Sequence, residues 1–185
     1  MKKILLTAVA VFAFSFANAQ DVKYGVKGGL NMSSNSAEGA TSITSFHLGG
    51  FAQFAINDKF AVQPELLYSA QGAKYTFFGL STTANLNYIN IPVMAKYKVA
   101  DAFSIEAGPQ LGFLMSATLA SIDYKDQCNS TDFGFNLGAG YDLNETMSLG
   151  LRYTMGLTNV EKDVPGEPST NSKNSNIQLS FGYKF

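Results

Sequence analysis

The last ten residues of the chain, 176–185, alternate polar and apolar side chains without a break and end on Phe185. Such alternation predicts a β-strand with one apolar and one polar face. Eight segments share this period of two: residues 22–32, 46–56, 60–70, 89–99, 103–115, 132–143, 147–157 and 176–185. Each is about the 9–11 residues that a tilted strand needs to cross a bilayer. We therefore expect an all-β fold, an eight-stranded antiparallel up-and-down transmembrane β-barrel with lipid outside and a polar interior.

The first 19 residues have the pattern of an export signal. Lys2 and Lys3 precede an apolar run, and Ala17-Asn18-Ala19 supplies the small residues that signal peptidase accepts. The apolar run is too short for a membrane-spanning helix of about 20 residues. We expect a cleaved signal peptide over 1–19 and an outer-membrane barrel domain over 20–185.

Short and long connections alternate along the chain. Residues 57–59, 100–102 and 144–146 are short polar turns that predict hairpins. Four longer polar stretches separate the hairpins, at 33–45, 71–85, 116–131 and 158–175. Short turns on one rim and long loops on the other are typical of outer-membrane barrels, with the loops outside the cell.

The three short turns also predict the strand register. They place Lys96 opposite Glu106, Phe51 opposite Glu65, and Gly138 opposite Arg152. All these residues also fall on the polar faces that alternation assigns, which a slip of one residue would prevent. Three prolines interrupt this scheme; we expect bulges or unpaired ladder positions at Pro64, Pro92 and Pro109.

Composition excludes several function classes. Without Lys2 and Lys3 the chain has 11 basic and 14 acidic residues, a net charge near −3, which argues against a nucleic-acid partner. The single cysteine, Cys128, cannot form an internal disulfide, and its polar neighbours predict a bystander thiol in a loop. One histidine and one distant cysteine indicate no metal site and no other cofactor.

Six motifs in order resemble the PorT-like outer-membrane β-barrel family. They are Tyr24–Asn31 (YGVKGGLN), Gln63–Ser69 (QPELLYS), Tyr88–Pro92 (YINIP), Glu106–Gln110 (EAGPQ), Phe133–Gly140 (FGFNLGAG) and Gly150–Tyr153 (GLRY). The resemblance covers essentially all of the mature chain and includes the three strand prolines. It implies an eight-stranded barrel in the outer membrane of a Gram-negative bacterium, similar to OmpA- and OmpX-type barrels. It implies little about activity.

The polar face carries the candidate functional residues. They are Lys23, Lys27, His47, Glu65, Lys96, Lys98, Glu106, Arg152 and Lys184. Eight strands enclose an interior just wide enough for side chains, where each charge must be paired or hydrated. We expect an interior charge network of Lys96, Glu106, Glu65 and Arg152, with Lys96–Glu106 as its firmest pair and Arg152 alongside Glu65. The same charges could instead line a pore or a gate.

An enzyme is the weakest alternative. A catalytic triad would need His47, the single histidine, with Ser45 or Ser69 and a carboxylate such as Glu65. Alternation points His47 inward, and nothing in the sequence marks a nucleophile beside it. A soluble ligand-binding barrel is disfavoured because the apolar face continues through all eight strands.

We therefore expect a small integral outer-membrane barrel with a filled polar interior, a structural or interaction role and no catalysis. Its partners would be outer-membrane lipid and, through loops 33–45, 71–85, 116–131 and 158–175, other envelope or extracellular proteins. The alternative is a narrow pore or a secretion- or transport-associated barrel.

Overall fold

The computed structural model describes residues 21–37, 39–77, 80–162 and 172–185. The long strands are β1 (Asp21–Asn35), β2 (Ala40–Ala55), β3 (Phe60–Phe77), β4 (Leu80–Lys98), β5 (Phe103–Leu119), β7 (Thr131–Asp142), β8 (Met147–Asn159) and β9 (Lys173–Lys184). A two-residue strand, β6 (Ile122–Asp123), and a short 3-10 helix, η1 (Lys125–Gln127), lie between β5 and β7. The described residues include no helix that is both long and apolar enough to cross a membrane.

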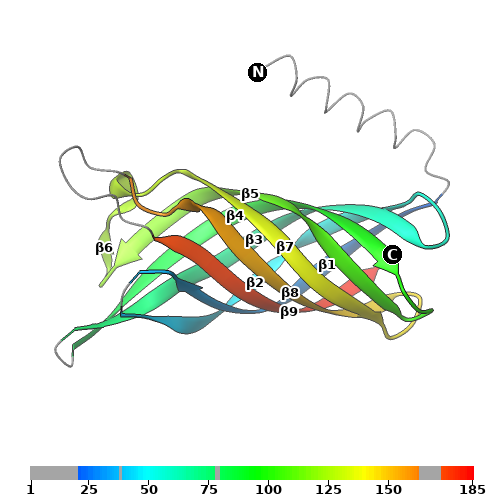
Figure 1. Ribbon diagram of the computed structural model, residues 1–185, viewed down its shortest axis with the longest axis horizontal. Helices are drawn as coiled ribbons and strands as arrows, with labels where there is room; N and C mark the ends of the chain where they lie inside the picture. The colour runs from blue at the N-terminus through cyan, green and yellow to red at the C-terminus, as the bar shows by residue number, and fades with distance from the viewer. Residues whose placement is uncertain (1–20, 38, 78–79, 163–171) are drawn as a thin grey trace, which may run out of the picture.

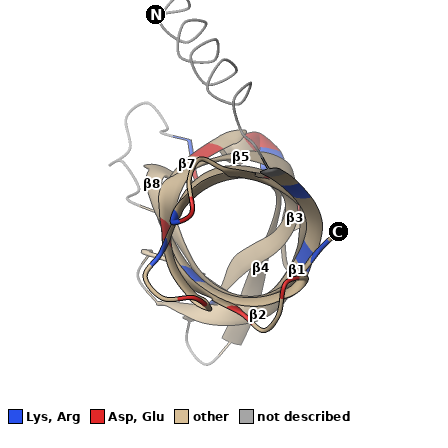
Figure 2. Ribbon diagram, turned by 90° about the vertical axis from the view of Figure 1, so that its right-hand side faces the viewer, with Lys and Arg blue, Asp and Glu red and all other residues tan. Residues whose placement is uncertain are grey.

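The eight long strands form a closed antiparallel ring. Each pairs with the long strands before and after it in the chain, and β9 pairs back onto β1, so the ring has no open edge. Figure 1 shows the strands running obliquely along the barrel, and Figure 2 shows the ring along its axis. The predicted eight-stranded up-and-down barrel is confirmed, with β6 as a small addition to β5.

The apolar face points out of the ring. Leu149, Leu151 and Leu179 are 41%, 55% and 54% exposed, whereas Arg152 and Gln178, which alternate with them, are each 2% exposed. An apolar exterior over all eight strands is the surface that lipid requires. The predicted assignment of the two faces is therefore confirmed.

The three short turns lie together at one end of the barrel, which we call the short-turn end; the opposite end is the long-loop end (Figure 1). Asparagine side chains hold two of these turns. Asn57 Oδ1 accepts the backbone N–H groups of Lys59 and Phe60, and Asn144 Oδ1 accepts those of Thr146 and Met147. Such contacts let a short polar segment reverse the chain.

The predicted register is confirmed at all three tested pairs. Lys96 pairs with Glu106, Phe51 with Glu65, and Gly138 with Arg152. The prediction of bulges or unpaired positions at the prolines is met by unpaired positions. The ladders skip positions beside Pro64, Pro92 and Pro109 and resume in the same register, while the register shifts lie elsewhere. Proline lacks an N–H, so it leaves a gap in the ladder without adding a residue.

The predicted loops are too long. Most of 33–45 and 71–85 is strand: residues 73–75 pair with 40–42 on one side and with 82–84 on the other. Of 116–131, part continues β5 and part forms β6 and η1, while β9 begins within 158–175. In β4 toward the long-loop end, Leu86 and Tyr88 are buried while Asn85 and Asn87 lie on the opposite face, so the apolar-out, polar-in pattern no longer holds although the hydrogen-bonded ladder continues. Residues 163–171 of the last predicted loop lie outside the described part, as does the predicted signal peptide.

Candidate functional site

A buried arginine joins three strands across the barrel interior. Arg152, on β8, donates from Nη1 and Nη2 to the two carboxylate oxygens of Glu65 on β3, at 2.9 and 2.8 Å. Its Nε donates to Glu106 Oε1 on β5 at 2.9 Å. Arg152, Glu65 and Glu106 are 2%, 3% and 7% exposed. The planar guanidinium therefore binds one carboxylate with two parallel hydrogen bonds and a second along its edge.

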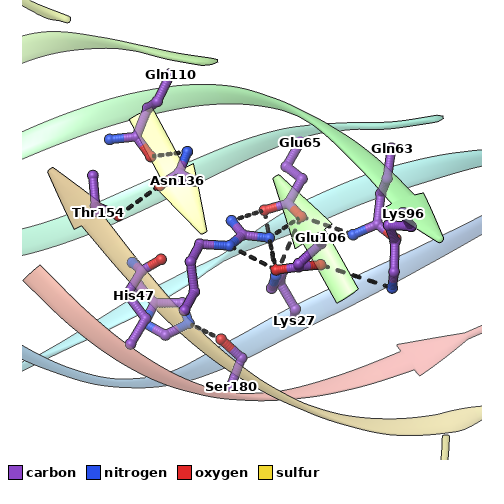
Figure 3. Close-up of polar contacts among 12 residues, drawn as sticks. Lys27, His47, Gln63, Glu65, Lys96, Glu106, Gln110, Asn136, Thr154 and Ser180 are labelled. Atoms are coloured by element: carbon purple, nitrogen blue, oxygen red, sulfur yellow. Dashed lines mark hydrogen bonds and ion pairs between the residues drawn. The ribbon is translucent and has the colours of Figure 1, made fainter. Parts of the chain in front are cut away.

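Two lysines complete this group, which we call the charge layer: Lys27, Glu65, Lys96, Glu106 and Arg152 (Figure 3). Lys27 Nζ on β1 lies 3.2 Å from Glu65 Oε1, and Lys96 Nζ on β4 lies 4.0 Å from Glu106 Oε2. Gln63 bridges the two halves, because its Nε2 donates to Glu65 at 2.7 Å and its Oε1 accepts from Lys96 at 3.4 Å. Buried carboxylates need such partners, since an unpaired charge in the interior is very costly.

The four residues expected to form the network, Lys96, Glu106, Glu65 and Arg152, do lie together. Their order of closeness differs from the expectation. The Lys96–Glu106 pair, expected to be the firmest, has the longest separation of the five ion pairs found among the described residues. Lys96 faces Glu106 on the adjacent strand, but the arginine fork reaches Glu106 across Gly138 on β7 and Glu65 on the opposite wall. The expectation also left out Lys27 and Gln63, whose inward position was the one available signal.

A second set of side chains, the polar layer, lies further toward the long-loop end. It consists of Asn31, His47, Ser69, Asn176, Gln178 and Ser180, all 5% exposed or less. His47 Nδ1 lies 2.9 Å from Asn31 Oδ1, and His47 Nε2 lies 2.9 Å from Ser180 Oγ. Asn31 Oδ1 also accepts from Asn176 and Gln178.

The residues weighed for a catalytic triad do not assemble. Ser45 donates to the Ala70 carbonyl, Ser69 accepts from Asn31 and Gln71, and Glu65 is bound by Arg152. Nothing in the sequence marked a nucleophile beside His47, but the structure places Ser180 Oγ there. However, the third member is the amide of Asn31, and Ser180 is buried within the polar layer. This arrangement holds strands β1, β2 and β9 together.

An apolar cluster lies inside the barrel at the long-loop end. It contains Leu86, Tyr88, Leu114, Ala117, Cys128 and Val160, with Tyr124 packed against it. Cys128 lies in the connection between η1 and β7, as predicted, but its side chain is only 1% exposed. The chain after η1 folds inward because Asn129 N–H and Lys162 N–H bind carbonyls of Val160 and Gln127. Burial raises the pKa of the Cys128 thiol to about 11, which keeps it protonated and unreactive at neutral pH.

The short-turn end is hollow. A cavity of about 640 Å³ opens there, lined by residues of β1–β5, β7 and the 57–59 turn, among them Lys23, Gln53 and Lys98. A much smaller cavity of about 30 Å³ lies beside the charge layer, in contact with Lys27, Glu106 and Arg152. In the described part of the chain, no three His, Cys, Asp or Glu residues are grouped as metal ligands would be.

Comparison with known proteins agrees with this architecture. Residues 17–162 match the family model described as outer membrane protein beta-barrel domain. No curated protein matches the chain. Among solved structures, Neisserial surface protein A (NspA) has 14% identity and a TM-score of 0.59, with 90% of this chain and 100% of that chain covered.

Two further structures are similar. Ail, the attachment invasion locus protein of Yersinia pestis, has 14% identity and a TM-score of 0.55 over 90% of this chain and 100% of its own. OprG from Pseudomonas aeruginosa has 17% identity and a TM-score of 0.50 over 88% and 95%. At these identities the likeness is one of fold.

Proposed function

The chain belongs to the outer membrane protein beta-barrel domain family, and from that membership we propose that it is a small integral outer-membrane protein with a structural or interaction role. Its interior is closed by its own side chains. The observation that carries this proposal is the charge layer, in which Arg152 binds Glu65 and Glu106 and so ties β8 to β3 and β5 through the interior. Catalysis forms no part of this role.

The closure has three levels along the axis. An ion entering from the short-turn end meets the charge layer first, where Arg152 cannot move without breaking its ion pairs with both Glu65 and Glu106. Breaking a buried pair costs about 3–5 kcal/mol, which makes spontaneous opening rare. The polar layer and the apolar cluster follow, and the cluster is made mainly of aliphatic and aromatic side chains, which replace the hydration shell of an ion poorly.

Planar-bilayer conductance tests this closure. We expect no steady single-channel currents from the wild-type protein, and currents from a variant in which Arg152, Glu65 and Glu106 are all replaced by serine. Heat-modifiable gel mobility of the same samples checks that each protein entered the bilayer folded. Steady currents from the wild type would overturn the proposal and favour the alternative, a narrow pore or a secretion- or transport-associated barrel. The cavity at the short-turn end is the observation that supports this alternative.

The long-loop end is the proposed surface for partners, which are outer-membrane lipid around the wall and envelope or extracellular proteins beyond it. Leu80 and Ile122 are 78% and 71% exposed there, outside the run of strands that lipid would cover. The names of Ail, an attachment invasion locus protein, and of Neisserial surface protein A are consistent with a surface role.

Surface labelling of intact cells tests this orientation. A membrane-impermeant amine reagent should modify Lys74 and Lys162 on whole cells, but Lys59 and Lys98 only after the outer membrane is permeabilised. The first pair lies toward the long-loop end and the second at the short-turn end, and all four are exposed. The opposite labelling pattern would reverse the proposed orientation.

We also propose that the chain belongs with the PorT-like members of its family and is exported through a cleaved signal over 1–19. The three strand prolines and the six motifs support the first statement, without a link to secretion. The basic start and the Ala17-Asn18-Ala19 pattern support the second. Amino-terminal sequencing of the protein from the outer membrane should begin at Gln20.

A further inference from the structure

The cavity at the short-turn end has an unusual lining. Four lysines face it, namely Lys23, Lys59, Lys96 and Lys98, against two carboxylates, Asp58 and Asp142. Asp142 is already engaged, because its Oδ1 accepts from Lys184 Nζ at 2.7 Å. Figure 2 looks into this end of the ring. The lining therefore carries an excess of positive charge.

Three of these ammonium groups lack an ion-pair partner. Within the described residues, no carboxylate lies within ion-pair distance of Lys23, Lys59 or Lys98. Lys96 has an ion pair with Glu106 at 4.0 Å and a hydrogen bond to Gln63 at 3.4 Å. Several positive charges around one opening with low-dielectric walls make the electrostatic potential there more positive, which attracts anions. A multivalent anion gains more from this potential than chloride does.

A neutral group on the same wall also lacks a partner. Gln53 lines the cavity, and its Oε1 is buried without a hydrogen bond in the described structure. An atom this deeply buried cannot itself contact a ligand in the cavity, but the amide NH₂ of the same side chain can donate a hydrogen bond to an anionic oxygen.

We propose that the short-turn mouth of the barrel binds a small multivalent anion of the phosphate type. Lys23, Lys59 and Lys98 supply charge and Gln53 supplies the hydrogen bond that fixes orientation. A volume of about 640 Å³ accepts such a group with its substituents, within the range typical of small-molecule sites. Both a free phosphate compound and the phosphate of a lipid headgroup carry this chemistry. The proposal does not depend on whether the interior conducts.

Isothermal titration calorimetry of the folded mature protein in zwitterionic detergent micelles tests the proposal. The probe is sodium pyrophosphate, with sodium chloride of equal ionic strength as the reference. We expect saturable binding of pyrophosphate to the wild type. A triple variant with Lys23→Gln, Lys59→Gln and Lys98→Gln should bind at least roughly tenfold more weakly, since three charge-assisted contacts are lost.

The matched control carries Lys74→Gln, Lys125→Gln and Lys173→Gln, which make the same change in net charge at the long-loop end. It should bind as the wild type does. Equal binding by both triple variants would show a nonspecific charge effect and overturn the site. The triple variant at the short-turn end is called the mouth triple. If its heat-modifiable gel mobility shows that it does not fold, it is replaced by the single variant Lys98→Gln, at an exposed residue.

A second arm separates the two sources of phosphate. Short-chain phosphatidic acid is added to the same micelles, and its binding is compared between the wild type and the two triple variants. Binding of the lipid alone, lost in the mouth triple, identifies a headgroup site; binding of pyrophosphate identifies a soluble ligand. Gln53→Leu should weaken either one without changing charge. Absence of saturable binding in both arms would sink the proposal.

Discussion

At the scale of the residue, Arg152 decides how the barrel interior is organised. Alternation alone directs it inward, and register alone places it opposite a glycine, Gly138. Neither says that its guanidinium binds Glu106, on the far side of that glycine, together with Glu65 on the opposite wall. The planar fork of arginine binds two carboxylates at once, which the single ammonium of Lys96 does less well.

Substitution of Glu65 by glutamine should destabilise the barrel strongly. The change keeps the shape but leaves Arg152 and Lys27 buried without their shared carboxylate. We expect a loss of about 3–5 kcal/mol in the free energy of unfolding. Urea titration of the protein in lipid vesicles, followed by heat-modifiable gel mobility, measures it. Glu145→Gln, in an exposed turn, is the control and should change stability by less than about 0.5 kcal/mol.

Cys128 gives a prediction about pH. Burial raises the pKa of its thiol from 9.0 to about 11, so the folded state holds this proton more tightly than the unfolded state does. Its contribution to stability is complete below about pH 9 and declines as the pH rises toward 11. At about pH 8 we expect slow reaction of the folded protein with a thiol reagent and fast reaction after unfolding in urea. Equal rates in the two states would contradict the burial of Cys128.

At the scale of the element, glycines make room for the bulky charges of neighbouring strands. A Cβ atom added to Gly138 on β7 would lie 2.7 Å from the Leu151 carbonyl oxygen and 3.0 Å from Glu106 Oε1. A Cβ at Gly150 on β8 would meet nothing closer than 3.8 Å. Both residues lie on the inward face, so they form a matched pair.

Gly138→Ala should therefore cost about 1–3 kcal/mol of unfolding free energy, because the added methyl is too close to the Leu151 backbone carbonyl and to the Glu106 carboxylate. Gly150→Ala should change stability by no more than about 0.5 kcal/mol. The same urea titration compares the two variants. A larger effect at Gly150 would mean that Gly138 does not provide the space that Glu106 and Arg152 occupy.

At the scale of the whole molecule, the outward direction of the apolar face determines the surroundings in which the barrel is stable. Leu151 is 55% exposed on the outer face of β8, at a position that lipid should cover. Leu151→Arg should lower stability in vesicles by about 2–4 kcal/mol if it lies near the bilayer midplane. Leu80→Arg is the control, since Leu80 is 78% exposed at the long-loop end and should tolerate the charge. A similar cost at both positions would mean that lipid does not distinguish them.

The sequence by itself determined the strands, their inward and outward faces, and three register pairs. It did so because the period of two and the short turns are local properties of the chain. The sequence did not determine how far the strands extend past the alternating segments, since residues 73–75 stay paired where alternation has ended. The tertiary structure alone decided that Arg152 binds Glu106 more closely than Lys96 does, that Ser180 adjoins His47 and that Cys128 is buried. Each of these contacts joins residues distant along the chain, and which of them meet depends on how the ring closes.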